Sequence, residues 1–103
     1  MTAKDMYRQL QSLVDEACRV DSFHVAIKGA QALGMVGGRD EKNIYALVYE
    51  FTANDESGAS VTLRFHSYDQ SKAFDVQPDM NKFKIALTHP DGITEVHTNE
   101  YEG

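Results

Sequence analysis

Residues 44–67 read IYALVYEFTANDESGASVTLRFHS, and this stretch decides the fold. Apolar and polar side chains alternate with a period of two on both sides of the polar segment 54–58, which predicts two strands joined as an antiparallel hairpin. The polar segment ends in Ser57-Gly58, a combination that suits a tight turn. We expect the apolar face of this hairpin to consist of Tyr45, Leu47, Tyr49, Phe51, Val61, Leu63 and Phe65.

A second hairpin is predicted nearer the end of the chain. Residues 82–87 alternate between polar and apolar side chains, and Pro90 and Gly92 follow at positions where a tight turn uses them. The partner strand is expected over residues 93–98. Residues 68–81, between the two hairpins, are polar and are predicted to form a loop or a short irregular strand.

The first element is predicted to be an amphipathic helix over residues 3–19. Thr2 can cap its N-terminus, and Asp5 lies in the first turn, where a carboxylate interacts favourably with the helix dipole. Apolar residues recur at helical spacing along this segment. The expected buried stripe consists of Leu10, Leu13, Val14 and Ala17.

The next segment, residues 21–38, allows two interpretations. As a helix it would end at the glycine pair of residues 37–38. As a strand, residues 23–27 would alternate before a glycine-rich turn at Gly29. The alanine content favours the helix, whereas Gly29 and Gly34 weaken it, and we lean to the helix. Its expected apolar face consists of Phe23, Ala26, Ile27, Ala30 and Leu33.

Together these elements predict an α+β fold, with an N-terminal helix, or two helices, packed on one face of a four- to five-stranded antiparallel sheet. Such a sheet has one apolar side that needs a cover, and the N-terminal helix is available to provide it. The 103 residues fit one domain spanning 1–103. Residues 99–103 are expected to form a flexible acidic tail.

The composition is that of an ordinary globular protein, with 42% hydrophobic and 25% charged residues. Cys18 is the single cysteine, which rules out an intramolecular disulfide and a cysteine-based zinc site and is compatible with a reducing cytoplasm. The sequence shows no signal-peptide pattern and no apolar stretch long enough for a membrane span. We therefore expect a soluble, cytoplasmic protein.

The charge balance bears on the kind of partner. Ten Lys and Arg against sixteen Asp and Glu give a net charge of −6, and no basic cluster occurs beyond Lys82 and Lys84. Direct nucleic-acid binding is not expected, because it normally needs a basic face to displace counterions from phosphates. The acidic surface would suit a partner protein with a basic surface, although the same charge also serves plain solubility.

Tests for reactive sites are negative. The glycines of residues 29–38 do not form a phosphate-binding loop, because Met35 follows Gly34 where the motif needs lysine. A metal site would need converging ligands, and His66 could join His97 only if their strands were neighbours with both side chains on one face. No catalytic residue, metal site or cofactor is therefore predicted, and the protein is not expected to be an enzyme.

One segment has the composition of a partner-binding surface. Residues 69–80 mix three aspartates with apolar anchors, and residues 100–102 of the tail have the same character. In the alternative interpretation, Phe74 and Val76 simply pack into the core beneath an ordinary loop. The candidate partner-binding residues are Asp69, Phe74, Asp75, Asp79, Met80, Glu100, Tyr101 and Glu102.

The functional prediction is a small acidic, non-enzymatic protein that binds another macromolecule, of the inhibitor, immunity or adaptor type that bacteria and phages encode. It rests on small size, acidic charge and the absence of reactive motifs. Exposed strand edges would also allow a homodimer. The alternative prediction is a small-ligand-binding domain with an apolar pocket between helix and sheet, lined by Tyr45, Tyr49, Phe51 and Phe65.

Overall fold

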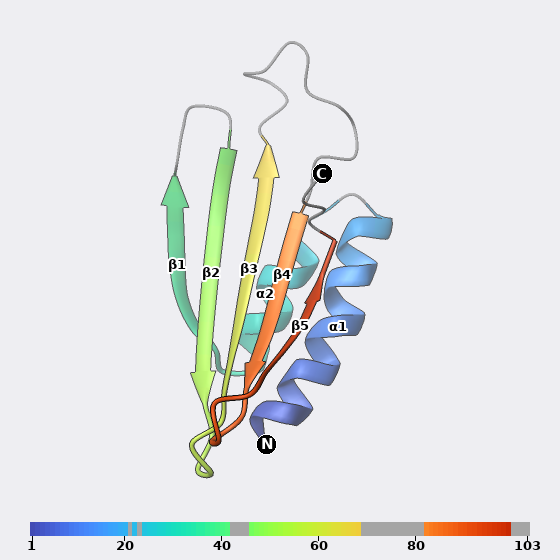
Figure 1. Ribbon diagram of the computed structural model, residues 1–103. Coiled ribbons are helices and arrows are strands. Elements are labelled where there is room, and N and C mark those ends of the chain that lie inside the picture. The colour runs from blue at the N-terminus through green and yellow to red at the C-terminus, as the bar shows by residue number, and fades with distance from the viewer. Residues whose placement is uncertain (21, 23, 42–45, 69–81, 100–103) are drawn as a thin grey trace.

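The computed structural model describes residues 1–20, 22, 24–41, 46–68 and 82–99, which form two helices packed on one open antiparallel sheet (Figure 1). The sheet order is β1-β2-β3-β4-β5, so every strand pairs with its neighbour in sequence. The predicted α+β fold is therefore confirmed. The elements are α1 (Ala3–Arg19), α2 (His24–Ala32), β1 (Val36–Glu41), β2 (Ala46–Asn54), β3 (Ser60–Tyr68), β4 (Lys82–Thr88) and β5 (Thr94–Thr98).

Helix α1 begins at a capping box. The Thr2 hydroxyl oxygen accepts a hydrogen bond from the Asp5 amide at 3.1 Å, and the Asp5 carboxylate accepts one from the Thr2 amide at 3.1 Å. The same helix end is also held from the sheet, because Asp55 in the β2–β3 turn accepts a hydrogen bond from the Ala3 amide at 2.9 Å. The sheet thus fixes the position of the helix N-terminus.

The buried stripe of α1 agrees with the predicted one at three of its four positions, Leu10, Val14 and Ala17, and extends it to Ala3 and Tyr7. Leu13, the fourth position, is only half buried and lies against α2. A Cβ atom at Gly29 of α2 would overlap the Leu13 side chain. Gly29, which weakens the helix prediction, therefore makes room for contact between the two helices.

The helical interpretation of the second segment is confirmed, but the predicted end of that helix is wrong. The helix ends at Ala32, and the chain turns away from it at Gly34, whose φ of 78° suits glycine. The Gly34 amide donates to the Gln31 carbonyl at 3.0 Å and the Met35 amide to the Ala30 carbonyl at 3.1 Å, the pattern of a Schellman motif. Of the two described helices, neither is long and apolar enough to cross a membrane.

Strand β1 was not predicted from the sequence. It pairs with β2 and contains the two glycines that were expected to end the helix. Gly37 lies opposite Phe51, where a Cβ atom would overlap the Glu50 carbonyl oxygen and the Phe51 ring. Glycine is needed at this position for close packing of two strands rather than for a helix end.

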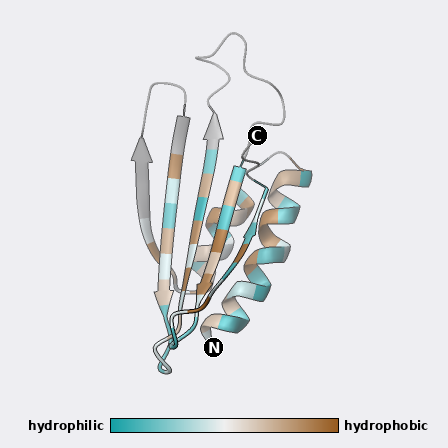
Figure 2. Ribbon diagram, viewed as in Figure 1, coloured by the Kyte–Doolittle hydropathy of each residue, from teal (hydrophilic) through white to brown (hydrophobic). Residues whose placement is uncertain are grey.

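The hydrophobic core lies between the helices and the face of the sheet that they cover, which we call the inner face. Both predicted hairpins are confirmed. Along β3 and β4 the inward residues are fully or almost fully buried, and Figure 2 shows the corresponding alternation of hydrophobic and hydrophilic residues on β4. The inward residues of these two strands are Val61, Leu63, Phe65, Phe83, Ile85 and Leu87, and those of β2 include Tyr49 and Phe51.

The two hairpin turns have the same construction. In the first, the Asp55 amide donates to the Ala59 carbonyl at 2.9 Å and Gly58 has a φ of 92°. In the second, the His89 amide donates to the Ile93 carbonyl at 2.8 Å and Gly92 has a φ of 92°. Each is a three-residue loop with glycine in the left-handed region, which sets the register of both hairpins.

Candidate functional site

The partner-binding residues suggested by the sequence lie outside the described residues. The structure therefore leaves that prediction untested, and the site is sought among the residues that it does describe. Asn99, which was assigned to the tail, is held against β4, because its Oδ1 accepts a hydrogen bond from the Phe83 amide at 2.7 Å. The predicted partner-binding residues, all of them outside the described ranges, are Asp69, Phe74, Asp75, Asp79, Met80, Glu100, Tyr101 and Glu102.

The helices cover one face of the sheet, and the opposite face, which we call the outer face, is turned to the viewer in Figure 1. Because side chains alternate along a strand, the neighbours of the buried residues of β3 and β4 lie on the outer face. Val48 of β2 also lies there, next to His66 of β3, and is only 2% exposed although it is not part of the core cluster.

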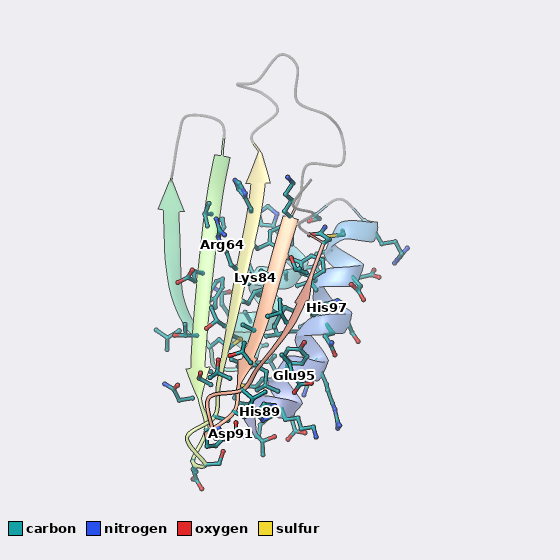
Figure 3. All side chains as sticks on the ribbon, in the orientation of Figure 1. Arg64, Lys84, His89, Asp91, Glu95 and His97 are labelled. Atoms are coloured by element: carbon teal, nitrogen blue, oxygen red, sulfur yellow. The ribbon has the colours of Figure 1, made fainter. Side chains whose placement is uncertain are left out.

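Cationic side chains gather on the outer face where β3 and β4 pair. Arg64 lies directly opposite Lys84, and His66 lies directly opposite Lys82. Since the two pairs are two residues apart along each strand, all four side chains share one face. Figure 3 shows Arg64 and Lys84 side by side on neighbouring strands. We call Arg64, His66, Lys82 and Lys84 the cation cluster.

The permanent cations of the cluster lack close counter-ions in the part of the chain that the structure describes. The ion pairs in that part of the chain involve Arg19, His89 and His97. Glu50 of β2 lies opposite Arg64 in the ladder but not within ion-pair distance of it. Like charges directly opposite each other destabilise a sheet. The cluster is thus an arrangement that the fold itself does not favour.

A row of small, methyl-bearing residues crosses the outer face beside the cation cluster. It ends in two exposed valines, Val36 with 76% and Val96 with 49% of its surface accessible. An exposed apolar patch rimmed by polar residues is typical of protein interaction sites. We call this the Val/Thr row, and it consists of Val36, Thr52, Thr62, Ala86 and Val96, one from each strand.

Two of the other histidines pair with carboxylates at the β5 edge. The Nε2 atom of His89 lies 2.7 Å from Glu95 Oε2, and that of His97 lies 3.3 Å from Asp15 Oδ1. The second pair links β5 to α1. His66 and His97 lie on opposite faces of the sheet, so the geometry that a shared metal site would need does not occur. Within the described ranges no group of three or more His, Cys, Asp or Glu residues could hold a metal ion.

The shifted pKa values among the described residues have structural causes. Hydrogen bonds from the Ser57 side chain, the Ala3 amide and two turn amides lower the pKa of Asp55 to about 2. Hydrogen bonds from Thr2 lower the pKa of Asp5, and burial raises the pKa of Tyr7. These groups belong to the helix cap, the turn and the core, so their shifts reflect the fold and not a reactive site.

The predicted apolar ligand pocket would be lined by residues that pack in the core. Phe51 and Phe65 are buried there, Tyr49 packs against the same cluster, and Tyr45 lies outside the described residues. Two open hollows lined by described residues both lie near the N-terminus of α1, away from the space between helices and sheet. The ligand-binding alternative therefore stays a prediction without a described cavity to support it.

Comparisons with known proteins give no further guide to function. No family model, no curated protein and no solved structure matches this chain. The candidate site is therefore defined by its own geometry, as the cation cluster and the Val/Thr row on the outer face.

Proposed function

We propose that this protein acts by binding another protein, and that the cation cluster receives an acidic segment of that partner. The observation that carries the proposal is the register of β3 and β4, which places Arg64 directly opposite Lys84 and His66 directly opposite Lys82. Neutral or acidic residues at these outer-face positions would serve the sheet better. A binding role would explain why basic residues occupy these positions.

The chemistry of the cluster suits carboxylates. Arg64 can bind a carboxylate with two parallel hydrogen bonds, and Lys84 beside it adds a second positive charge. An acidic segment laid across the two strands would meet the positive charges of Arg64, Lys82 and Lys84 at once. Its apolar side chains would meet the Val/Thr row, which lies next to the cluster in the same ladder.

A protein partner fits this face better than a nucleic acid does. Binding of single strands normally uses aromatic side chains on which bases stack. The outer-face side chains that the structure describes include no Phe, Tyr or Trp, and Glu50 lies exposed beside Arg64. The net charge of −6 would further repel a polyanion as large as a nucleic acid.

The proposal is compatible with each of the predicted types, inhibitor, immunity protein and adaptor, because each type acts through a surface that binds another protein. It differs from the sequence-based expectation in the sign of the partner's charge. The basic partner was inferred from net charge and from the aspartates of residues 69–80. That expectation and the present proposal concern different surfaces and can be tested side by side.

The test is a titration of ¹⁵N-labelled protein with a short peptide rich in Glu and Leu, followed by amide chemical shifts. We expect shift changes centred on Arg64, Lys82 and Lys84, and loss of binding in Lys84→Glu. Lys28→Glu is the matched control, because Lys28 is exposed on α2, away from the sheet's outer face, and the change in charge is the same. Shift changes confined to other elements, or equal binding by both variants, would refute the proposal.

Two parallel titrations separate the alternatives. A single-stranded oligonucleotide that binds the cluster more tightly than the acidic peptide would replace the protein partner with a nucleic acid. A Lys-rich peptide that shifts only Asp69, Asp75 and Asp79 would support the sequence-based surface instead. Each titration is run at low and high salt, since binding through charge weakens as salt is added.

A further inference from the structure

Strand β5 lies at one edge of the described sheet. Among the described strands it pairs with β4 alone. Its residues include neither lysine nor proline, which natural edge strands often use to block association. Val96 within it and Ile93 just before it are 49% and 61% exposed. This edge is therefore open to another strand.

In an antiparallel hairpin, alternate residues of a strand form backbone hydrogen bonds with the partner strand. This alternation shows which backbone groups of β5 point away from β4. The His89 amide donates to the Ile93 carbonyl, and the Phe83 amide and carbonyl are used by the side chains of Asn99 and Thr98. Alternate residues of β5 in this register, Glu95 and His97, therefore direct their backbone groups toward β4. The backbone groups of Val96 and its next-but-one neighbours point away from β4.

We propose that β5 pairs antiparallel with β5 of a second copy of this chain, about a two-fold axis at Val96. In that register Val96 lies opposite Val96 of the second copy, and its outward amide and carbonyl match those of its counterpart. Glu95 lies opposite His97 of the second copy, and His97 lies opposite Glu95. The strand TEVHT thus matches itself in backbone pairing, and Glu95 and His97, which also pair with His89 and Asp15 of their own chain, face each other across the two-fold axis.

The paired copies would form one continuous sheet with both pairs of helices on the same side. The Val/Thr row of one copy would then continue into that of the other through the two Val96 side chains. The interface uses the backbone edge of β5 and none of the cation cluster. Its existence is thus independent of the proposed binding function.

A cysteine-pairing experiment tests the register. In a Cys18→Ser background, Val96→Cys places two thiols opposite each other at a Cα separation of about 5.5 Å, which a disulfide can span. Thr94→Cys alone leaves its two thiols about 13 Å apart, four residues along the strand. A mixture of Thr94→Cys and Thr98→Cys chains brings those two positions together.

The expected result with oxidised glutathione is a disulfide-linked dimer for Val96→Cys and for the mixture, but not for Thr94→Cys or Thr98→Cys alone. Cross-linking of Thr94→Cys alone to the extent seen in the mixture would show a different register. Failure of Val96→Cys to cross-link, in protein whose circular dichroism shows it folded, would overturn the proposal.

Sedimentation measurements with two matched valine variants locate the interface. Val96→Lys should convert the dimer to monomer while circular dichroism shows the chain still folded, since the side chain is exposed. Val36→Lys introduces the same substitution in the Val/Thr row, but on strand β1 at the opposite edge of the sheet. It should therefore leave the dimer intact. A wild-type chain that stays monomeric at about 1 mM would refute the dimer. Lys84→Glu should remain dimeric, which separates this proposal from the binding proposal.

Discussion

Single residues connect distant parts of this fold, and Asp55 is the clearest case. Its carboxylate accepts hydrogen bonds from Ser57 and Ala59 within the β2–β3 turn and from Ala3 at the start of α1. Asp91 in the second turn accepts a comparable bond from Ile93 but makes no contact with a helix. The two turns have the same construction, but only the Asp55 carboxylate accepts a hydrogen bond from a helix as well as from its own turn.

Replacing Asp55 with Asn should lower the melting temperature more than the matched change Asp91→Asn does. Because the folded-state pKa of Asp55 is about 2, below its ordinary value of 3.8, the carboxylate stabilises the fold above pH 4. That stabilisation is lost as the pH falls from about 4 to 2. Thermal melts across this range should show the deficit of Asp55→Asn shrinking toward acid. A deficit that stays constant from pH 7 to 2 would contradict this role.

A second prediction at the residue scale concerns the close approach of β1 and β2. Gly37→Ala should destabilise the protein by about 1–3 kcal/mol, because the added methyl group overlaps backbone and ring atoms that have little room to move. Gly29→Ala is the control, since its methyl group would meet only the flexible end of Leu13. Urea unfolding measures both changes. An equal or larger loss for Gly29→Ala would contradict the packing assigned to Gly37.

At the scale of elements, the hairpins could be predicted from sequence because their signals are local. Alternation of side chains and a glycine at the turn are both contained in short segments, and both strand pairs formed as expected. The end of the second helix was predicted too late in the chain, because two glycine signals follow the helix. Gly34 ends the helix, whereas Gly37 serves the contact with Phe51, and only the strand pairing tells these two uses apart.

The cation cluster could not be predicted, for a physical reason. The sequence shows Lys82 and Lys84 as a short basic pair and Arg64 and His66 as separate polar positions of another strand. Their meeting depends on the register between β3 and β4, whose connection spans residues 69–81. No local turn chemistry sets a register across so long a connection.

One prediction belongs to the docking of β5 on α1. Asp15→Asn removes the carboxylate that pairs with His97, so the amides of β5 should exchange faster with solvent. The free energy of unfolding should fall by less than about 1 kcal/mol, because the pair is partly exposed. Glu16→Gln, which breaks only the contact with Arg19 inside the helix, is the control. Equal exchange in both variants would show that the Asp15–His97 pair does not hold the strand.

At the scale of the whole molecule, the charge distribution is uneven. Three of the ten Lys and Arg residues lie in the cation cluster of a chain whose net charge is −6. An acidic partner would be attracted to this patch and repelled elsewhere, which favours one orientation of approach. The association rate of such a partner should fall steeply as salt is added, and stopped-flow mixing measures it. A rate independent of salt would contradict charge-guided approach.

The central claim is that the cation cluster is kept for binding at some cost to the fold, and Lys84→Glu tests it in a single variant. The change turns a like-charge pair with Arg64 into an opposite-charge pair. Urea unfolding should show a free energy of unfolding higher than that of the wild type by about 0.2–1 kcal/mol, while binding of the acidic peptide is lost. A variant that is less stable than the wild type, yet still binds the acidic peptide, would contradict the account.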